Sequence, residues 1–138
     1  PDNDAECKML LNRSGKNPLD SVNCIVSKIE FLEMQSEVQN VFVSDDMARY
    51  IVSLISATRR HPLLSRGASP RATLSLTDMA KAVAFAEGRD YIVPRDVQNI
   101  FICTVNHRII LNAKASASKK NSEEILHEIL RKTPKPRT

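Results

Sequence analysis

The chain has 138 residues, enough for about one domain with a hydrophobic core. Hydrophobic residues make up 42% of it, but only 4% is aromatic and Trp is absent, so the core must consist of Leu, Ile, Val, Met and Ala. With only three glycines, this Ala- and Leu-rich composition favours helices. The net charge of +4 and the pI of about 9.2 suit a phosphate-bearing partner, although many plain domains share them.

The same composition argues against several classes of protein. Cys7, Cys24 and Cys103 are odd in number and widely spaced, which disfavours a disulfide framework or a zinc site. Reduced thiols are typical of the cytosol, so we expect a cytoplasmic location. No apolar run of about 18 residues occurs, so we expect no membrane segment. Because the chain begins at Pro1 without Met, we expect it to be a fragment of a longer protein.

The N-terminal part carries weak signals for regular structure. Residues 4–11 are compatible with a helix that stops at Gly15. A helix this short is marginal without packing, so its partner is expected outside this chain. Pro18 keeps Asn17 out of helical geometry, so residues 16–26 are predicted to be an extended linker.

A capping box predicts the start of the next helix. The hydroxyl of Ser27 would cap the helix, and the carboxylate of Glu30 would accept a hydrogen bond from the Ser27 N–H. The helix should run to about Gln39. Residues 41–43 are too few and too β-branched to extend it, and we expect them to pair with residues 91–93. The predicted apolar stripe consists of Phe31, Met34 and Val38.

Ser44 is the predicted cap of a further helix, which closes with Arg59 and Arg60 and is stopped by Pro62. Residues 62–68 are expected to form a loop. Six residues at helical spacing should face the core, namely Met47, Tyr50, Ile51, Leu54, Ile55 and Thr58.

The next helix is predicted over residues 69–87, with Ser69 as N-cap, Pro70 at the first helical position and Gly88 just past the end. Its many alanines permit close approach of a neighbouring helix. The predicted inner face consists of Ala72, Leu76, Met79, Ala80 and Val83.

Two more helices complete the prediction. One begins at Pro94 and runs to about Asn112, a flexible link follows over residues 113–120, and Asn121 with Glu124 caps the last helix. The fold class is therefore all-α, a small helical bundle with room for one short two-stranded β contact. The predicted core residues of these helices are Val97, Ile100, Phe101, Thr104, Val105, Ile125, Leu126, Ile129 and Leu130.

An arginine in the first turn of the helix that starts at Pro70 is unusual. The helix dipole favours Asp or Glu at an N-terminus, where free N–H groups already attract anions. Arg71 makes sense there if it reaches for a phosphate, which a guanidinium grips through two parallel hydrogen bonds. The alternative is an ordinary helix start with a solvated or salt-bridged arginine.

Other catalytic chemistry is weakly represented in the sequence. It contains no GxxxxGK[ST] or GxGxxG loop, and no HExxH or GxSxG motif. The histidines are isolated in sequence, so none is expected to act as a base. Asp90 and Asp96 beside Arg89 and Arg95 predict a local ion-pair and capping cluster. The arginines around the 62–68 loop form either a solvated basic rim or a phosphate-facing edge: Arg59, Arg60, Arg66 and Arg71.

Seven short motifs then become significant through their order and spacing. Together they resemble the C-terminal lid domain of MoxR-family AAA+ ATPases, and the resemblance covers residues 16–112. The lids of magnesium chelatase ATPase subunits are similar in part, but the fourth motif favours MoxR. A departure is the polar run at 73–78. The motifs are VFVS at 41–44, YIV at 50–52, ATR at 57–59, GASPRA at 67–72, AKA at 80–82, GRDYIVPRDV at 88–97 and HR at 107–108.

The resemblance implies a domain organisation and a function. Residues 1–26 would be the tail of an AAA+ core plus a linker, 27–133 the helical lid and 134–138 a disordered tail. Arg71 matches the sensor 2 arginine, which reaches ATP phosphates. Arg59 and Arg89 match positions where an intersubunit or a structural role is open. The missing core would hold ATP and Mg²⁺, so this chain alone should contain no catalytic residue and hydrolyse no ATP.

Family members form rings, typically hexamers, and act as chaperone-like factors with von Willebrand factor A-type proteins or other clients. The partners implied are therefore the chain's own AAA+ core, neighbouring subunits and such a client. Two alternatives remain: a nucleic-acid-binding helical module, which we disfavour because the residues that follow Arg71 are poor base readers, and a purely structural assembly module.

Overall fold

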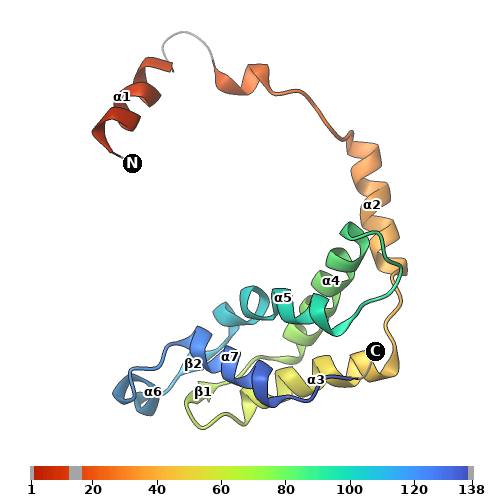
Figure 1. The fold of residues 1–138 in the computed structure, drawn as a ribbon, viewed down its shortest axis with the longest axis vertical. Coiled ribbons are helices and arrows are strands. Elements are labelled where there is room, and N and C mark those ends of the chain that lie inside the picture. The colour runs from red at the N-terminus through yellow and green to blue at the C-terminus, as the bar shows by residue number, and fades with distance from the viewer. Residues whose placement is uncertain (1, 13–16, 137–138) are drawn as a thin grey trace. The chain divides into compact units, whose positions relative to one another are not determined.

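The computed structural model describes residues 2–12 and 17–136, so Gly15 and residues 137–138 lie outside the described part (Figure 1). The chain divides into two compact units, residues 1–33 and 34–138. Seven α-helices, two short 3₁₀ helices and two short strands are present in the described residues. The all-α class predicted from the sequence is confirmed.

The first unit contains only short elements. Helix α1 (Asn3–Asn12) begins where the Asp2 carboxylate accepts a hydrogen bond from the Ala5 N–H at 2.8 Å. The predicted linker contains a 3₁₀ turn, η1 (Pro18–Ser21), because the Asn17 side chain accepts from the Leu19 N–H at 3.2 Å. The prediction of a wholly extended linker was therefore wrong. All side chains of this unit whose burial is described are exposed.

Helix α2 (Lys28–Asn40) starts at the predicted capping box. The Glu30 carboxylate accepts from the Ser27 N–H at 2.7 Å, and the Ser27 hydroxyl accepts from the Glu30 N–H at 3.2 Å. These two bonds lower the pKa of Glu30, because they favour the ionised carboxylate. Of the predicted apolar stripe, Phe31 and Met34 are exposed, at 55% and 43%, whereas Val38 is half-buried.

Helix α3 (Asp45–Arg59) contributes six buried residues to the core of the second unit. The Ser44 hydroxyl caps it by accepting from the Met47 N–H at 3.3 Å. All six residues predicted for its inner face are buried. The spacing of the apolar residues identified this face correctly, because they form one continuous stripe toward the core over about three turns.

Helix α4 (Pro70–Ala86) packs against α3 and against α5 (Pro94–Val105). Its buried positions recur every four residues and are alanine at three of the four: Ala72, Leu76, Ala80 and Ala84. Met79 is 48% exposed, and its predicted place in the core was wrong. Met79 is not one of the positions spaced four residues apart, and it therefore lies beside the buried stripe of α4 rather than within it.

The C-terminal end of α5 differs from the prediction. The helix ends at Val105, a 3₁₀ turn η2 (Asn106–Arg108) follows, and strand β2 (Ile110–Leu111) pairs antiparallel with β1 (Leu64–Arg66). The segments predicted as the end of a helix and as a loop therefore form a two-stranded sheet. The β-branched residues around Ile110 favour an extended backbone once a partner strand is present.

Two short helices close the second unit. Helix α6 (Ala113–Ala117) replaces the predicted flexible link, because the Asn112 side chain caps it and Ala115 is fully buried. Helix α7 (Ser122–Lys132) has the predicted Asn121–Glu124 capping box and packs against α3 and α5. Figure 1 shows β1, β2 and α6 together at one end of this unit.

The predicted pairing of residues 41–43 with 91–93 is confirmed as a parallel bridge between Phe42 and Tyr91. The Phe42 N–H donates to the Asp90 carbonyl at 2.7 Å, and the Ile92 N–H donates to the Phe42 carbonyl at 3.1 Å. Val41 and Ile92 are buried on one side, while Phe42 and Tyr91 are exposed on the other.

Candidate functional site

Arg71 lies in the first turn of α4, directly after Pro70 at the first helical position. Its side chain is exposed, and within the described residues its guanidinium has no hydrogen bond or ion pair. Ser69 occupies the N-cap position, but its hydroxyl does not form the predicted capping bond. The Ala72 N–H bonds instead to the Ser69 carbonyl at 2.9 Å. Among the described residues, no side chain therefore forms a capping hydrogen bond at the N-terminus of this helix.

The turn before α4 rests on the last turn of α3. The Ala68 N–H donates to the Thr58 hydroxyl at 2.9 Å, and the Ala68 carbonyl accepts from the Arg59 Nε at 2.7 Å. Ala68 itself is 1% exposed. Arg59 therefore has a partner within this chain, at the turn that leads to Arg71.

The other two arginines of the predicted rim are exposed. Arg60 is the C-cap of α3, and Arg66 lies in β1. With Arg59 and Arg71 they surround the segment from the end of α3 to the start of α4, as the sequence predicts. Of these four arginines, only Arg59 has a side chain that forms a hydrogen bond with this segment in the described part of the chain.

Arg89 belongs to a different cluster, at the junction between α4 and α5. Its guanidinium donates two hydrogen bonds to the Asp96 carboxylate, and further bonds to the Glu87 carboxylate and the Tyr91 carbonyl. These bonds, to Asp96 first, raise the pKa of Arg89 above its usual value. Asp96 also accepts from the Val93 N–H at 2.8 Å and so caps α5. The predicted ion-pair and capping cluster therefore forms through Arg89 and Asp96.

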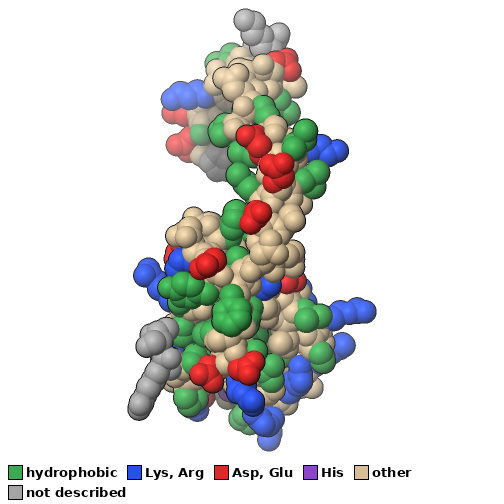
Figure 2. Space-filling view, turned by 90° about the vertical axis from the view of Figure 1, so that its right-hand side faces the viewer, with side chains coloured by type: hydrophobic (Ala, Val, Ile, Leu, Met, Phe, Trp, Pro, Cys, Tyr) green, Lys and Arg blue, Asp and Glu red, His purple; other side chains and the backbone are tan. Residues whose placement is uncertain are grey.

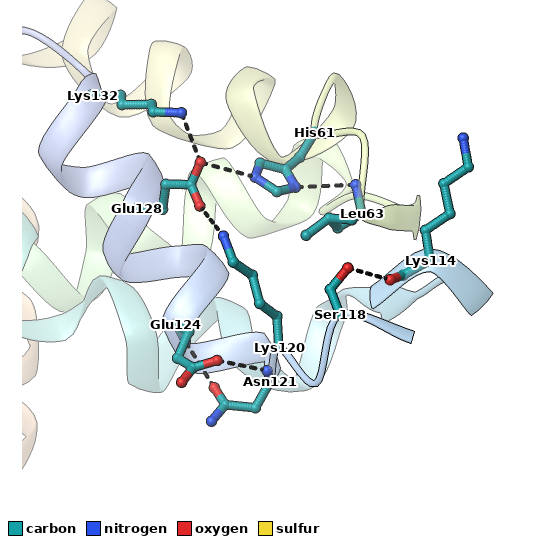
Figure 3. A network of polar contacts seen from close by, with 9 residues as sticks. All are labelled: His61, Leu63, Lys114, Ser118, Lys120, Asn121, Glu124, Glu128 and Lys132. Carbon is teal, nitrogen blue, oxygen red and sulfur yellow. Dashed lines mark hydrogen bonds and ion pairs between the residues drawn. The ribbon is translucent and has the colours of Figure 1, made fainter. Parts of the chain in front are cut away.

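A second network joins α7 to the turn after α3 (Figure 3). The Glu128 carboxylate accepts from Lys120 at 2.8 Å and from Lys132 at 2.7 Å, and His61 Nε2 lies 3.9 Å from it. Hydrogen bonds from these two lysines lower the pKa of Glu128 to about 2. His61 Nδ1 in turn accepts from the Leu63 N–H at 3.3 Å. His61 is thus a structural link between elements here.

Arg71 lines none of three pockets that the described residues form. A pocket of about 290 Å³ is lined by Val41, Phe85 and Asp90, among others. Phe85 is at the C-terminal end of α4, roughly 20 Å from the first turn along the helix axis. Figure 2 shows hydrophobic side chains on the displayed face interspersed with charged ones, rather than gathered into one continuous patch.

The described residues contain neither a metal-binding cluster nor a helix that could span a membrane. No group of three or more His, Cys, Asp or Glu side chains is arranged there to hold a metal ion. Within residues 2–12 and 17–136, no helix has the length and apolar character needed to cross a membrane. The candidate site therefore consists of an exposed arginine at a helix N-terminus and the buried turn that supports it.

Comparison with known proteins identifies the family. Residues 56–129, more than half of the chain, match the family described as AAA lid domain. The chain belongs to the AAA lid domain family. This match covers α4, whose first turn carries Arg71, and the residues that support that turn.

Relatives of the lid confirm the resemblance to MoxR. This chain is 33% identical over 130 residues to the uncharacterised protein YeaC of Bacillus subtilis, covering 94% of this chain and 41% of YeaC. It is 29% identical over 140 residues to Chaperone MoxR1 of Mycobacterium tuberculosis, covering 95% and 37%. The chain thus spans about two fifths of the length of these curated relatives.

A solved structure supports the same fold. The crystal structure of a protein from Cytophaga hutchinsonii, described as a candidate ATPase, superposes on the lid with a TM-score of 0.82 at 34% sequence identity. The match covers 99% of this chain and 44% of the Cytophaga hutchinsonii chain. The lid is accordingly similar to one part of larger proteins.

Arg71 and Arg59 of the candidate site were predicted from the sequence, as was Arg89 of the α4–α5 junction, but two residues of the candidate site were missed. Thr58 was expected only as a core residue, although its hydroxyl holds Ala68. The fit of Gly67 against α3 was not predicted either. Two signals in the sequence could have identified them. Thr58 places a hydroxyl at the end of an apolar helix face, and Gly67 is one of only three glycines in the chain.

Proposed function

We propose that this lid supplies Arg71 to the phosphates of ATP in a MoxR-type AAA+ ATPase. The observation that carries the proposal is an exposed arginine in the first turn of a helix. Among the described residues, this arginine has no ion pair or side-chain hydrogen bond, and no side chain caps the helix N-terminus. Free N–H groups and the helix dipole already favour an anion there, and the guanidinium adds a bidentate donor. The lid match over residues 56–129 and the MoxR relatives support this role.

The rest of the ATPase lies outside this chain in the proposal. An AAA+ core would precede the lid, hold ATP with Mg²⁺ and pack against residues 1–26, whose described side chains are exposed. Arg71 would then stabilise negative charge on the phosphate as it is transferred, which is worth several kcal/mol in comparable sites. The chain alone is expected to hydrolyse no ATP, because the sequence contains no phosphate-binding loop.

The proposed setting is a cytoplasmic, chaperone-like ring, such as a hexamer, that works on a client or with a von Willebrand factor A-type protein. The name of one relative, Chaperone MoxR1, supports the chaperone-like role. The free cysteines support the cytoplasmic location, because thiols stay reduced there: Cys7, Cys24 and Cys103. Arg89 is proposed to stabilise the α4–α5 junction, since its hydrogen bonds go to that junction.

The test is steady-state ATPase activity and ATP affinity of the full-length protein that carries this lid, with Arg71→Ala. Turnover should fall at least about tenfold, roughly 1.4 kcal/mol in the barrier. Arg95→Ala is a matched control, because Arg95 is also exposed and also follows a proline at the first position of a helix. It should leave turnover unchanged.

Two results would contradict the proposal. If Arg71→Ala leaves both turnover and ATP affinity unchanged, the lid is a structural assembly module. If it instead removes a salt-sensitive affinity for duplex DNA, the nucleic-acid module is correct.

A further inference from the structure

We infer that Thr58 and Arg59 are positioning residues for Arg71: together they fix the peptide of Ala68, and through it the direction in which α4 begins. This inference rests on the proposed function of Arg71. It assigns to Thr58 and Arg59 the role of holding the backbone of Ala68 in place.

The Thr58 hydroxyl has two partners. It donates to the Ile55 carbonyl at 2.6 Å and accepts from the Ala68 N–H at 2.9 Å. Thr58 is fully buried, so no water replaces either bond when the hydroxyl is removed. The first bond fixes the hydroxyl on α3, and the second fixes the incoming loop to it.

Arg59 holds the other end of the same residue. Its Nε donates to the Ala68 carbonyl at 2.7 Å, so consecutive side chains of α3 satisfy both backbone polar groups of Ala68. A buried backbone group needs such a partner, because leaving it unpaired costs free energy comparable to a lost hydrogen bond. The two bonds approach Ala68 from α3 and leave its backbone little freedom to turn.

Gly67 brings the loop backbone into direct contact with α3. A Cβ atom at this position would lie 2.5 Å from both the Cα and N atoms of Arg59. Real side chains do not approach a backbone so closely, so only glycine permits this contact. The loop is therefore held by its backbone as well as by the two hydrogen bonds.

Little freedom remains between this contact and Arg71. Arg71 lies three residues after Ala68, and Pro70 has a fixed φ angle. Ala72, the next residue, is fully buried on α4. Arg71 thus starts from a backbone held on both sides by buried alanines, which pre-organises its approach to a phosphate. A shift of about 1 Å at such a group can cost a hundredfold in rate.

The experiment uses the full-length protein and compares Thr58→Val with wild type. The substitution keeps the volume but removes the hydroxyl, and ATPase turnover or ATP affinity should fall about tenfold as Arg71 is displaced. Thr58→Ser restores the hydroxyl and should recover most of this loss. Thr77→Val is the matched control, since Thr77 donates to the Thr73 carbonyl within α4 and does not contact Ala68.

A double-mutant cycle separates positioning from stability. In the Arg71→Ala background, Thr58→Val should produce no further loss, because the group that it positions is already absent. Arg59→Met should behave in the same way, and it provides a second readout if Thr58→Val does not fold.

The outcomes distinguish the two proposals. If Arg71→Ala lowers activity while Thr58→Val and Arg59→Met do not, this inference is wrong and the proposed function stands. The inference is also wrong if the activity loss of a double variant equals the product of the losses of Arg71→Ala and of Thr58→Val or Arg59→Met. If Arg71→Ala is silent, the proposed function fails, and the positioning role fails with it.

Discussion

The guanidinium of Arg89 and the carboxylate of Asp96 face each other through two parallel hydrogen bonds of 2.7 and 2.8 Å. The Asp96 side chain is only 1% exposed. Removing Arg89 would leave this buried carboxylate without its cationic partner, and such changes strongly destabilise proteins. We expect Arg89→Met to lower the free energy of unfolding by about 3 kcal/mol, measured by urea denaturation.

Arg95→Met is the comparison for that measurement. Arg95 is adjacent to Asp96 in sequence but exposed, and it has no ion pair within the described part of the chain. Its replacement should change the free energy of unfolding by no more than about 0.5 kcal/mol. Equal effects of the two substitutions would show that the bidentate pair does not stabilise the junction.

Gly67 and Gly88 should respond to alanine for different reasons. An alanine Cβ at position 67 would collide with the backbone of Arg59, so the turn must move, at a cost of about 3 kcal/mol. Gly88 has a φ of +74° and open space around it, so Gly88→Ala should cost about 1 kcal/mol from backbone strain alone.

Activity measurements separate the two glycines further. Gly67→Ala should lower ATPase activity of the full-length protein beyond its effect on stability, whereas Gly88→Ala should not, because Gly88 lies at the opposite end of α4. An unchanged urea midpoint for Gly67→Ala would contradict the close contact.

The Glu128 network predicts a specific acid sensitivity. The pKa of Glu128 is lowered from 4.5 to about 2 in the folded chain. A lowered pKa stabilises the fold above the unfolded value, and this contribution is lost as the pH falls from 4.5 toward 2. Glu128→Gln should therefore flatten the decline of the melting temperature over this range.

Glu123→Gln on the same helix is the control for the acid titration. Glu123 is exposed and forms no ion pair with a described residue, so its replacement should leave the slope close to that of wild type. Since Lys132 is largely exposed, high salt should also weaken the Glu128 contribution. Identical slopes for Glu128→Gln and wild type would contradict the network.

Much of the fold was predictable because its helices carry strong local signals. The capping boxes at Ser27 and Asn121 and the apolar face of α3 are confirmed. The β1–β2 sheet was missed because Leu64 and Leu111 pair across 47 positions of sequence, and short strands have no local signal of their own. Helix α6 was missed because five residues are too few to show a helical period, and its formation depends on the Asn112 cap and on the burial of Ala115.

The site was predictable in part. Arg71 was identifiable because an arginine opposes the helix dipole at its position. The roles of Thr58 and Gly67 depend on where the loop after α3 folds back, which spacing along one helix does not specify. The predicted hydroxyl cap at Ser69 was wrong because backbone bonding competes for the same N–H groups.

The most direct test is a crystal structure of the full-length protein with Mg²⁺ and a non-hydrolysable ATP analogue. The account predicts that the Arg71 guanidinium lies about 2.8 Å from a phosphate oxygen. It also predicts that the Thr58 and Arg59 bonds to Ala68 are retained in that complex. A nucleotide whose phosphates are bound entirely by other residues, with Arg71 turned to solvent, would contradict the account.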